Sequence, residues 1–426
     1  GRVYVAGGEY GTGGYAGEVY DPIANTWTMC PALSGGEFIS DANSEILPDG
    51  KILQAIVGSG SRRMYIYNPV ANTYTTGTPS FGSHNESAWV KLPDNSILFV
   101  DIYSTNSERY IPATNTWVHD ANVPVLLYDA YGYETGGAFL LPDGRAFFIG
   151  AAGTTAIYTP SGSTAPGSWV TGPAIPGGQG APDAAAAMMV NGKIIFTVSP
   201  PPIPADHFPT PMSFYEYDYV ANTITPITTP TGGTSLPSPC YYSNMLCLPN
   251  GHIMYVSMGD DQYYEYVPDG TPLLSGQPTI SNITELTCTT FRITGTLFNG
   301  ITEGANYGDD WQMNTNYPII RLSSGPNVYY ARSYNWNSTG VMRGSAPDTT
   351  YFTLPLGLPN GTYAVEVVAN GNPSAPVLLT TGPANLSPLS STICEGGTTT
   401  LIASIPGGIW TSSTPGVASV GSVSGL

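Results

Sequence analysis

The chain has 426 residues, enough for two or three domains, and its charge balance is strongly acidic. Twelve Lys and Arg residues stand against thirty Asp and Glu residues, and the formal net charge of −18 would repel a nucleic-acid backbone or an anionic lipid surface. No apolar run approaches the roughly 18 residues of a membrane-spanning helix. Only 10% of residues are charged, while 51 Gly and 39 Pro fall between short apolar runs. The composition is typical of an extracellular all-β protein and argues against nucleic acid and membrane insertion.

An apolar strand, a tight turn and a second apolar strand recur six times before residue 276. Asp-Gly or Asn-Gly in such a turn supplies the positive φ of a two-residue hairpin, and Asn95 tolerates that conformation nearly as well. The opening GRVYVAGG is expected to be the same hairpin without its first strand, which upstream sequence would supply. The second turn residue marks each repeat, at spacings of 45 to 59 residues: Gly1, Gly50, Asn95, Gly144, Gly192 and Gly251.

A second hairpin follows each of these turns. It reads VYDPIANTW from Val19, IYNPVANTY from Ile66 and RYIPATNTW from Arg109, with a weaker copy, EYDYVANTI, from Glu216. Two degenerate copies, from Ile157 and Glu265, keep only the Tyr and Pro before the turn. Each repeat therefore supplies four antiparallel strands, named a to d in chain order, which together make one propeller blade. The sequence predicts an all-β fold that begins with a propeller of six visible blades.

The repeat resembles the kelch motif in three features: the doublet Gly7-Gly8 after the b strand, the Tyr before the third turn, and Trp27 or Trp117 after it. Residues 1–276 as a whole resemble the propeller of the galactose-oxidase-like family. Propellers of that family usually have seven blades, so the resemblance implies a seven-bladed parent protein.

The repeat period stops at Gln277, where a new series of strands with Gly and Asn turns begins. Residues 277–382 resemble the immunoglobulin-like (early-set) domain that follows the propeller in galactose oxidase relatives. Residues 383–426 combine a Pro- and Ser-containing linker with what resembles the start of a bacterial Ig-like repeat. By analogy with exported bacterial surface proteins, we expect an extracellular or cell-surface location and further Ig-like domains in the parent chain.

The connections between blade strands differ at the two ends of the predicted propeller. One end carries short uniform turns, and the other carries long, Tyr-rich loops of the kind in which binding residues usually lie. Tyrosine rings with their hydroxyl groups suit sugar stacking and polar recognition, although many of the 29 tyrosines must simply pack between blades. The predicted ligand-binding residues on the long loops are Tyr10, His84, Tyr131, Tyr133, His207 and Tyr263.

Small residues occupy one shared position of the predicted inner strands, where they fit a crowded channel wall: Ala42, Ser87, Gly136, Ala185 and Ser243. One or two residues earlier stand Asp41, Glu86, Glu134 and Asp183. A ring of these carboxylates at the channel mouth would suit Ca²⁺ or a cationic ligand. The alternative interpretation is that they are solvated loop acids of an acidic protein. Apart from Ca²⁺, we expect no cofactor.

The family resemblance implies a copper radical site made of a Tyr joined to a Cys, a Tyr-His pair and a His from the domain after the propeller. This sequence departs from that pattern. Its histidines are His84, His119, His207 and His252; none follows a Tyr and none lies beyond residue 276. Two dispersed loop histidines make a poor copper site, so the sequence argues against copper.

The leading functional hypothesis is a noncatalytic recognition or adhesion protein that binds a glycan or a surface protein. The alternative is an enzyme that acts on carbohydrate, either by copper radical oxidation or by paired carboxylates among Glu86, Glu134 and Asp183. No sialidase-type motif supports the second chemistry. Five scattered cysteines indicate no zinc site, and Cys240 and Cys247 are either paired or buried free thiols.

Overall fold

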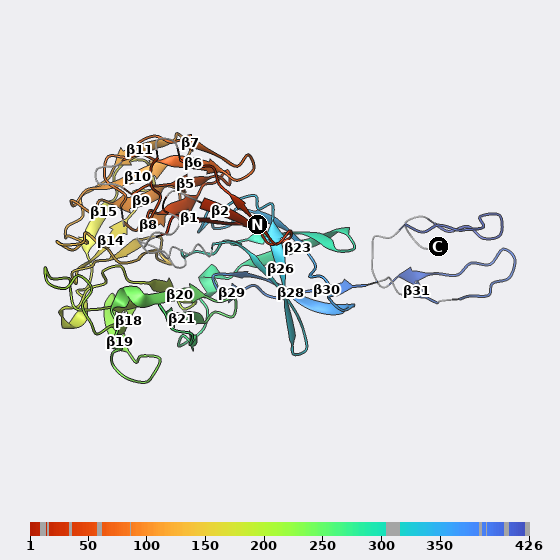
Figure 1. Cartoon of the computed structure of the whole chain (residues 1–426). Coiled ribbons are helices and arrows are strands. Elements are labelled where there is room, and N and C mark those ends of the chain that lie inside the picture. Colours follow the sequence, from red (N-terminus) through yellow and green to blue (C-terminus); the bar gives the residue numbers. More distant parts are fainter. Residues whose placement is uncertain are drawn as a thin grey trace.

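The computed structural model of the chain is built from β-strands, with three single-turn 3₁₀ helices at Pro176–Gly178, Cys240–Tyr242 and Leu274–Gly276. It describes residues 1–8, 14, 17–33, 36–57, 62–85, 87–303, 316–382, 386–388, 390–403 and 409–421. Six small sheets come first and a larger sheet follows (Figure 1). None of the helices in these ranges is long and apolar enough to cross a lipid bilayer.

The six small sheets are the blades of a six-blade β-propeller, as the sequence predicted. In each blade the strands lie in chain order and pair antiparallel with their neighbours. Over the described residues, blades 2 to 5 have four strands and blades 1 and 6 have three. The strands are β1 (Val3–Ala6), β2 (Gly17–Asp21) and β3 (Thr26–Met29) in blade 1; β4 (Ser44–Ile46), β5 (Ile52–Gln54), β6 (Tyr65–Asn68) and β7 (Thr73–Thr76) in blade 2; β8 (Trp89–Lys91), β9 (Ile97–Val100), β10 (Ser107–Ile111) and β11 (Thr116–His119) in blade 3; β12 (Ala138–Leu140), β13 (Ala146–Ile149), β14 (Thr155–Thr159) and β15 (Ser168–Thr171) in blade 4; β16 (Ala186–Met188), β17 (Ile194–Val198), β18 (Ser213–Asp218) and β19 (Thr223–Ile227) in blade 5; and β20 (Ser243–Cys247), β21 (Ile253–Ser257) and β22 (Tyr264–Tyr266) in blade 6.

The same hydrogen bond closes the outer hairpin of four blades. The Tyr hydroxyl before the turn donates to the Oδ1 of the Asn five residues later, and that Asn has a left-handed φ of 52° to 54°. Asn is one of the few residues that adopt this conformation at low cost. The pairs are Tyr20 with Asn25, Tyr67 with Asn72, Tyr110 with Asn115, and Tyr217 with Asn222.

The turn between strands a and b also has the predicted positive φ, which is 78° at Gly50 and 65° at Asn95. In blade 5 this turn starts one residue earlier than the sequence suggested. Met189 accepts the hydrogen bond from the Gly192 amide, as Leu47 does from the Gly50 amide. The prediction that Ala185 shares the small-residue position was therefore out of register by one residue, because the VNGK turn lacks the Pro of the other copies.

Neighbouring blades bury apolar side chains against each other. Leu53 of blade 2 packs with Ile97 and Phe99 of blade 3 in one buried cluster. Blade 1 differs, because Val3 and Val5, at the positions of Ile97 and Phe99, are 53% and 50% exposed, whereas Ile97 and Phe99 are 0% exposed. Strand pairing places Trp27 and Met29, which are also exposed, on the same face of that sheet. Four apolar side chains on this face of blade 1 are thus open to solvent, beside the half-buried Glu18 and Tyr20.

The C-terminal β domain, residues 279–381, is one sheet of eight strands that curls around a core including Phe291, Ile320, Phe352 and Val365. Its immunoglobulin-like kinship stays a prediction. The strands are β23 (Thr279–Thr287), β24 (Thr290–Thr296), β25 (Ile319–Ser324), β26 (Asn327–Tyr334), β27 (Asp348–Thr353), β28 (Gly361–Ala369), β29 (Asn372–Pro373) and β30 (Val377–Thr381). A two-stranded sheet, β31 (Leu386–Ser387) with β32 (Ile402–Ala403), lies beyond it (Figure 1).

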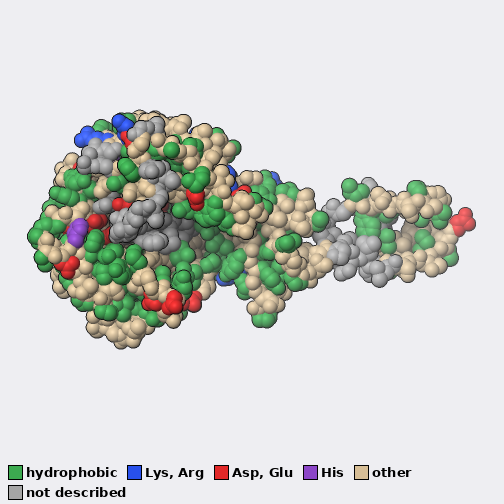
Figure 2. Space-filling model, viewed as in Figure 1, with side chains coloured by type: hydrophobic (Ala, Val, Ile, Leu, Met, Phe, Trp, Pro, Cys, Tyr) green, Lys and Arg blue, Asp and Glu red, His purple; other side chains and the backbone are tan. Residues whose placement is uncertain are grey.

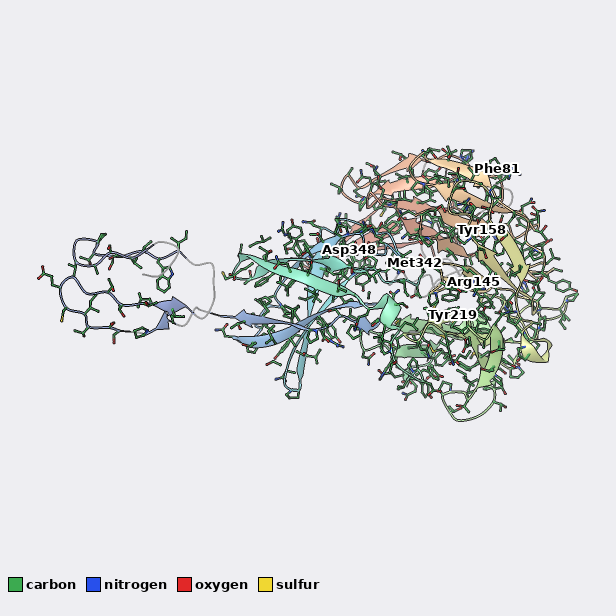
Figure 3. The ribbon with its side chains drawn as sticks, turned by 180° about the vertical axis from the view of Figure 1, so that it is seen from behind. Phe81, Arg145, Tyr158, Tyr219, Met342 and Asp348 are labelled. Atoms are coloured by element: carbon green, nitrogen blue, oxygen red, sulfur yellow. The ribbon has the colours of Figure 1, made fainter. Side chains whose placement is uncertain are left out.

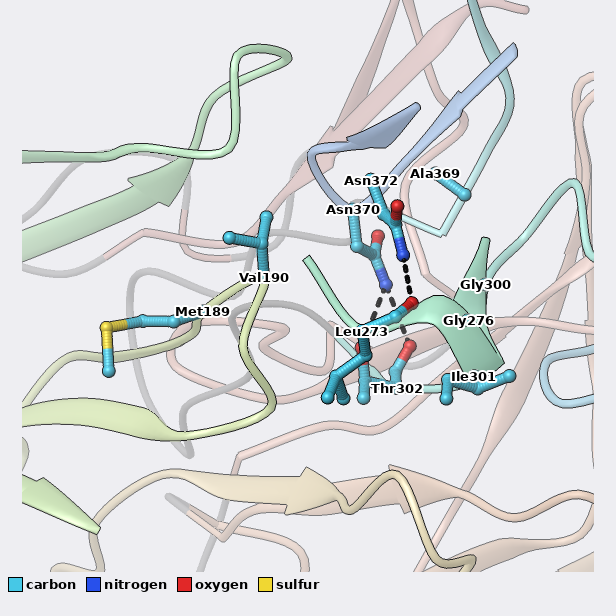
Figure 4. Close-up of a pocket in the computed structure, with 10 residues that line it drawn as sticks. All are labelled: Met189, Val190, Leu273, Gly276, Gly300, Ile301, Thr302, Ala369, Asn370 and Asn372. Carbon is cyan, nitrogen blue, oxygen red and sulfur yellow. Dashed lines mark hydrogen bonds between the residues drawn. The ribbon is translucent and has the colours of Figure 1, made fainter. Parts of the chain in front are cut away.

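The C-terminal β domain covers the propeller end that carries the a–b turns. Thr339 donates through its hydroxyl to the Leu47 carbonyl at 3.0 Å, and Gly371 lies so close to the blade 6 turn that a Cβ there would be 2.6 Å from the Gly251 Cα. Met342 lies close to the turn residues of blade 4, as the labelled side chains in Figure 3 show. A cavity of about 20 Å³, room for one water molecule, lies between Val190, Leu273 and Asn370 (Figure 4).

Candidate functional site on the long-loop end

The loops between strands b and c, and between one blade and the next, lie at the propeller end opposite the C-terminal β domain. This follows from the antiparallel order of every blade, because alternate connections of such a sheet lie at opposite ends. Phe81, which belongs to one of these loops, lies on the side of the propeller away from the C-terminal β domain (Figure 3). The visible surface of the propeller carries mostly apolar and uncharged polar side chains (Figure 2).

The loop that enters blade 4 is held in shape by Asp129, which is buried. Its Oδ1 accepts hydrogen bonds from the Tyr131 and Gly132 amides, both at 2.7 Å, and its Oδ2 accepts one from the Glu134 amide at 2.9 Å. Tyr133 between them has a left-handed φ of 68°, which is uncommon for an aromatic residue. The loop therefore presents its tyrosines in one defined backbone conformation.

Three tyrosines form a cluster on this loop and its neighbour. The ring of Tyr133 lies 4.8 Å from that of Tyr103 and 5.9 Å from that of Tyr128, measured between centroids. Tyr103 comes from the b–c loop of blade 3, and both it and Tyr133 are exposed, as is Tyr131. Phenol rings with one free face and a hydroxyl group at the rim can stack on a ligand and hydrogen-bond to it.

A second aromatic cluster adjoins the first at Gly132. A Cβ atom at Gly132 would lie 1.8 Å from His207 Nε2, so only glycine allows this close approach. From His207, ring contacts continue to Phe208 at 4.6 Å and on to Tyr241 at 4.4 Å. With the exposed Tyr131 of the Asp129 loop, the two clusters form what we call the aromatic loop surface: Tyr103, Tyr128, Tyr131, Tyr133, His207, Phe208, Tyr241 and Tyr242.

Of the residues predicted to bind a ligand, Tyr131, Tyr133 and His207 are brought together on this surface. Tyr263 is exposed in the b–c loop of blade 6, and the ring contacts found among the described residues do not join it to the two clusters. Tyr10 lies outside the described residues. Tyr103 and Phe208 were not singled out from the sequence, where single aromatic residues in loops carry no distinguishing pattern.

His84 lies in the interior instead of on a loop surface. Its ring is fully buried, stacks on Phe99 at 3.6 Å between centroids, and accepts a hydrogen bond at Nδ1 from the Trp89 indole at 3.0 Å. Its Nε2 lies 3.9 Å from a carboxylate oxygen of Glu108. Burial lowers the pKa of His84 well below its ordinary value, because the charged ring would lose its hydration. The residue therefore packs blade 3 and does not face a ligand at the loop end.

The predicted carboxylate ring is described at Asp41, Glu134 and Asp183, all of which are buried. They are thus not solvated surface acids. The Asp183 amide donates to the Thr135 carbonyl at 3.0 Å, which joins the entry loops of blades 4 and 5. Glu86 lies outside the described residues, and within the described ranges no three His, Cys, Asp or Glu side chains are grouped so that they could hold a metal ion. The Ca²⁺ site stays a prediction.

The other histidines and the two neighbouring cysteines considered in the sequence analysis pack against the protein or pair within it. The ring of His119 stacks on Phe81 at 3.8 Å, and His252 pairs with Glu265 at 2.6 Å beside an a–b turn. Cys240 and Cys247 are free buried thiols, which decides between the two alternatives left open by the sequence. Burial raises the pKa of the Cys240 thiol to about 12, so it is protonated at neutral pH.

Comparison with known proteins supports the kelch-type repeat but does not identify a catalytic or binding residue. The model of the kelch motif matches residues 1–34. A solved structure described as a novel fungal alcohol oxidase with catalytic diversity among the AA5 family, in complex with copper, is similar over 89% of this chain and 83% of its own. The identity is 15% and the TM-score 0.49, too distant a similarity to transfer residue roles. No curated protein matches the sequence.

Proposed function

We propose that this chain is a noncatalytic recognition module of a secreted or cell-surface protein and that it binds a glycan through the aromatic loop surface. The observation that carries the proposal is the cluster of Tyr128 and Tyr133, on a loop whose backbone Asp129 holds in place, with Tyr103 from the neighbouring b–c loop of blade 3. A platform that is ordered before binding loses little conformational entropy when the ligand docks.

The chemistry of the surface favours a neutral sugar over an anionic one. Aromatic rings stack on the C–H faces of sugars, and their hydroxyl groups hydrogen-bond to the sugar hydroxyls. The net charge of −18 opposes the approach of sulfated or sialylated glycans. A protein ligand with exposed aromatic or polar side chains would use the same contacts, and competition by free sugar distinguishes it from a glycan.

A carbohydrate-cleaving enzyme is a second candidate, because the hydrogen bond from Asp183 to Thr135 places the loops that carry Glu134 and Asp183 next to each other. Paired carboxyl groups are the usual catalysts of glycoside hydrolysis. An enzyme of this kind would release reducing ends from the glycan that it binds, and replacing Glu134 by Gln would stop the release while leaving binding in place.

The test is a glycan-array screen of the full chain, followed by calorimetry with the glycans that bind. We expect Tyr131→Ala and Tyr103→Ala each to weaken binding about tenfold, the equivalent of one lost stacking contact. Tyr330→Ala is the matched control, since Tyr330 is similarly exposed but lies on β26 of the C-terminal β domain. The proposal fails if the array yields no ligand, or if Tyr330→Ala weakens binding as much as the loop variants do.

A further inference from the structure

Three ionisable side chains meet where the C-terminal β domain contacts the propeller. Glu45 belongs to β4 and Lys91 to β8, the innermost strands of blades 2 and 3, and Glu303 follows β24 of the C-terminal β domain. Lys91 Nζ lies 2.7 Å from Glu45 Oε1, and the Lys91 amide donates to Glu303 Oε2 at 2.8 Å. The three residues, which we call the junction triad, are only 4%, 2% and 3% exposed.

The charges of the junction triad do not balance if every group is ionised. Two carboxylates and one ammonium group would leave a net charge of −1 in the interior, where an uncompensated charge is expensive. The Glu45 carboxylate is held by Lys91, so a proton on Glu303 would remove the excess negative charge. Burial and the nearby Glu45 charge raise the pKa of Glu303 well above its ordinary value, and Lys91 only partly opposes them.

Neutral groups complete the surroundings of the triad. From the C-terminal β domain, the Thr339 carbonyl lies 3.5 Å from Lys91 Nζ, and the Thr339 hydroxyl donates to the Leu47 carbonyl. Within the described residues, Glu45 from blade 2 and Lys91 from blade 3 are the charged groups that act on Glu303. The protonation of Glu303 is therefore coupled directly to the contact between the two domains, because its carboxyl group accepts a hydrogen bond from the Lys91 amide of the propeller.

We propose that the junction triad makes the contact between propeller and C-terminal β domain pH-dependent: the contact is tight while the buried Glu303 carboxyl carries a proton and weakens when that proton is lost. The folded state holds this proton to a higher pH than the unfolded state does. The stabilisation is thus fully present below the unfolded carboxyl pKa of about 4.3 and is lost as pH rises toward the folded value. Across that window the folding equilibrium constant falls by up to about tenfold per pH unit.

The test compares the full chain with its Glu303→Gln variant in thermal melts from pH 4 to pH 9. Gln keeps the size of the side chain and offers an N–H donor to Glu45 without a titrating proton. We expect the wild-type protein to lose stability relative to the variant as pH rises, with the two curves converging at the acidic end. Glu366→Gln is the matched control, because Glu366 pairs with Arg321 inside the C-terminal β domain at 2.9 Å. Curves for wild type and Glu303→Gln that run parallel would overturn the proposal.

A second measurement keeps the test decisive if Glu303→Gln does not fold. Hydrogen exchange at the Lys91 amide of the wild-type protein reports the contact directly, since this amide donates to Glu303. We expect its protection factor to fall with rising pH, whereas that of the Trp89 amide, in the same strand β8 but not bonded to Glu303, should stay level. Equal pH dependence at both amides would contradict the proposal.

Discussion

The two ends of the propeller are built from the same strands but differ in what they contact. At one end, the short turns around Leu47 and Gly251 contact the C-terminal β domain, and the buried charges of the junction triad lie there. At the other end, long loops present Tyr103, Tyr131 and Tyr133 to solvent. The uniform turns thus lie at the end that the C-terminal β domain covers, and the irregular loops lie at the end that is open to a ligand.

The comparison predicts that the largest loss of stability comes from the covered end. Lys91→Met would leave Glu45 and Glu303 buried without a cation, and we expect a loss of about 3 to 5 kcal/mol in the free energy of unfolding, measured by denaturant titration. Lys51→Met is the matched control, because Lys51 pairs with Asp49 in an exposed turn and should contribute no more than about 1 kcal/mol. If both variants lost similar amounts of unfolding free energy, the buried ion pair of Lys91 would contribute no more to stability than the exposed pair of Lys51.

An intermediate effect is expected near the open end, from His84. The folded-state pKa of His84 lies below its unfolded value, so its contribution to stability is present above about pH 6.5 and is lost as pH falls. We expect up to about 1.4 kcal/mol less stability per pH unit in this window. His84→Gln can still accept the Trp89 hydrogen bond but does not titrate, so its urea midpoint should vary less between pH 6.5 and pH 4.5. An unchanged slope would show that the buried ring does not control acid stability.

The smallest effects should come from backbone conformation, with opposite signs at the two ends. Gly50 has a φ of 78° and no atom within 4 Å of the place of a Cβ, so Gly50→Ala should cost about 1 kcal/mol through the backbone alone. Ser40, in a loop at the open end, has a φ of 43°, and Ser40→Gly should gain up to about 1 kcal/mol. Calorimetric melts of the two variants should shift in opposite directions, and shifts in the same direction would contradict the assignment of backbone strain.

The blades could be predicted from the sequence because the residues that form their turns lie only a few positions apart in the chain. A two-residue turn that needs a positive φ, as at Gly50, and a Tyr five residues before an Asn, as at Tyr20, each act within a few residues of chain. The prediction failed by one residue at Ala185, where the turn lacks its usual Pro. The proximity of Tyr131 to Tyr133 was likewise evident from their spacing.

The parts that escaped prediction depend on residues far apart in the chain. His84 stands in a loop segment with no apolar pattern, and its burial depends on Trp89, Phe99 and Trp117 closing around it. Glu303 is separated from Lys91 by 212 residues, so no spacing in the sequence relates the two. Local turn chemistry predicts strands and loops, whereas the pairing of buried charges is decided only when the domains meet.

The open apolar face of blade 1 has a consequence for colloidal behaviour. Val3 and Val5 on β1, with Trp27 and Met29 on β3, expose apolar side chains on one face of the sheet, the kind of surface through which molecules self-associate. Mutual repulsion between molecules of charge −18 opposes such contacts. Dissolved salt shortens the range of that repulsion to about 8 Å at 0.15 M. It does not weaken the hydrophobic attraction between the exposed apolar side chains. We therefore expect the solubility of residues 1–426 to decrease as ionic strength rises.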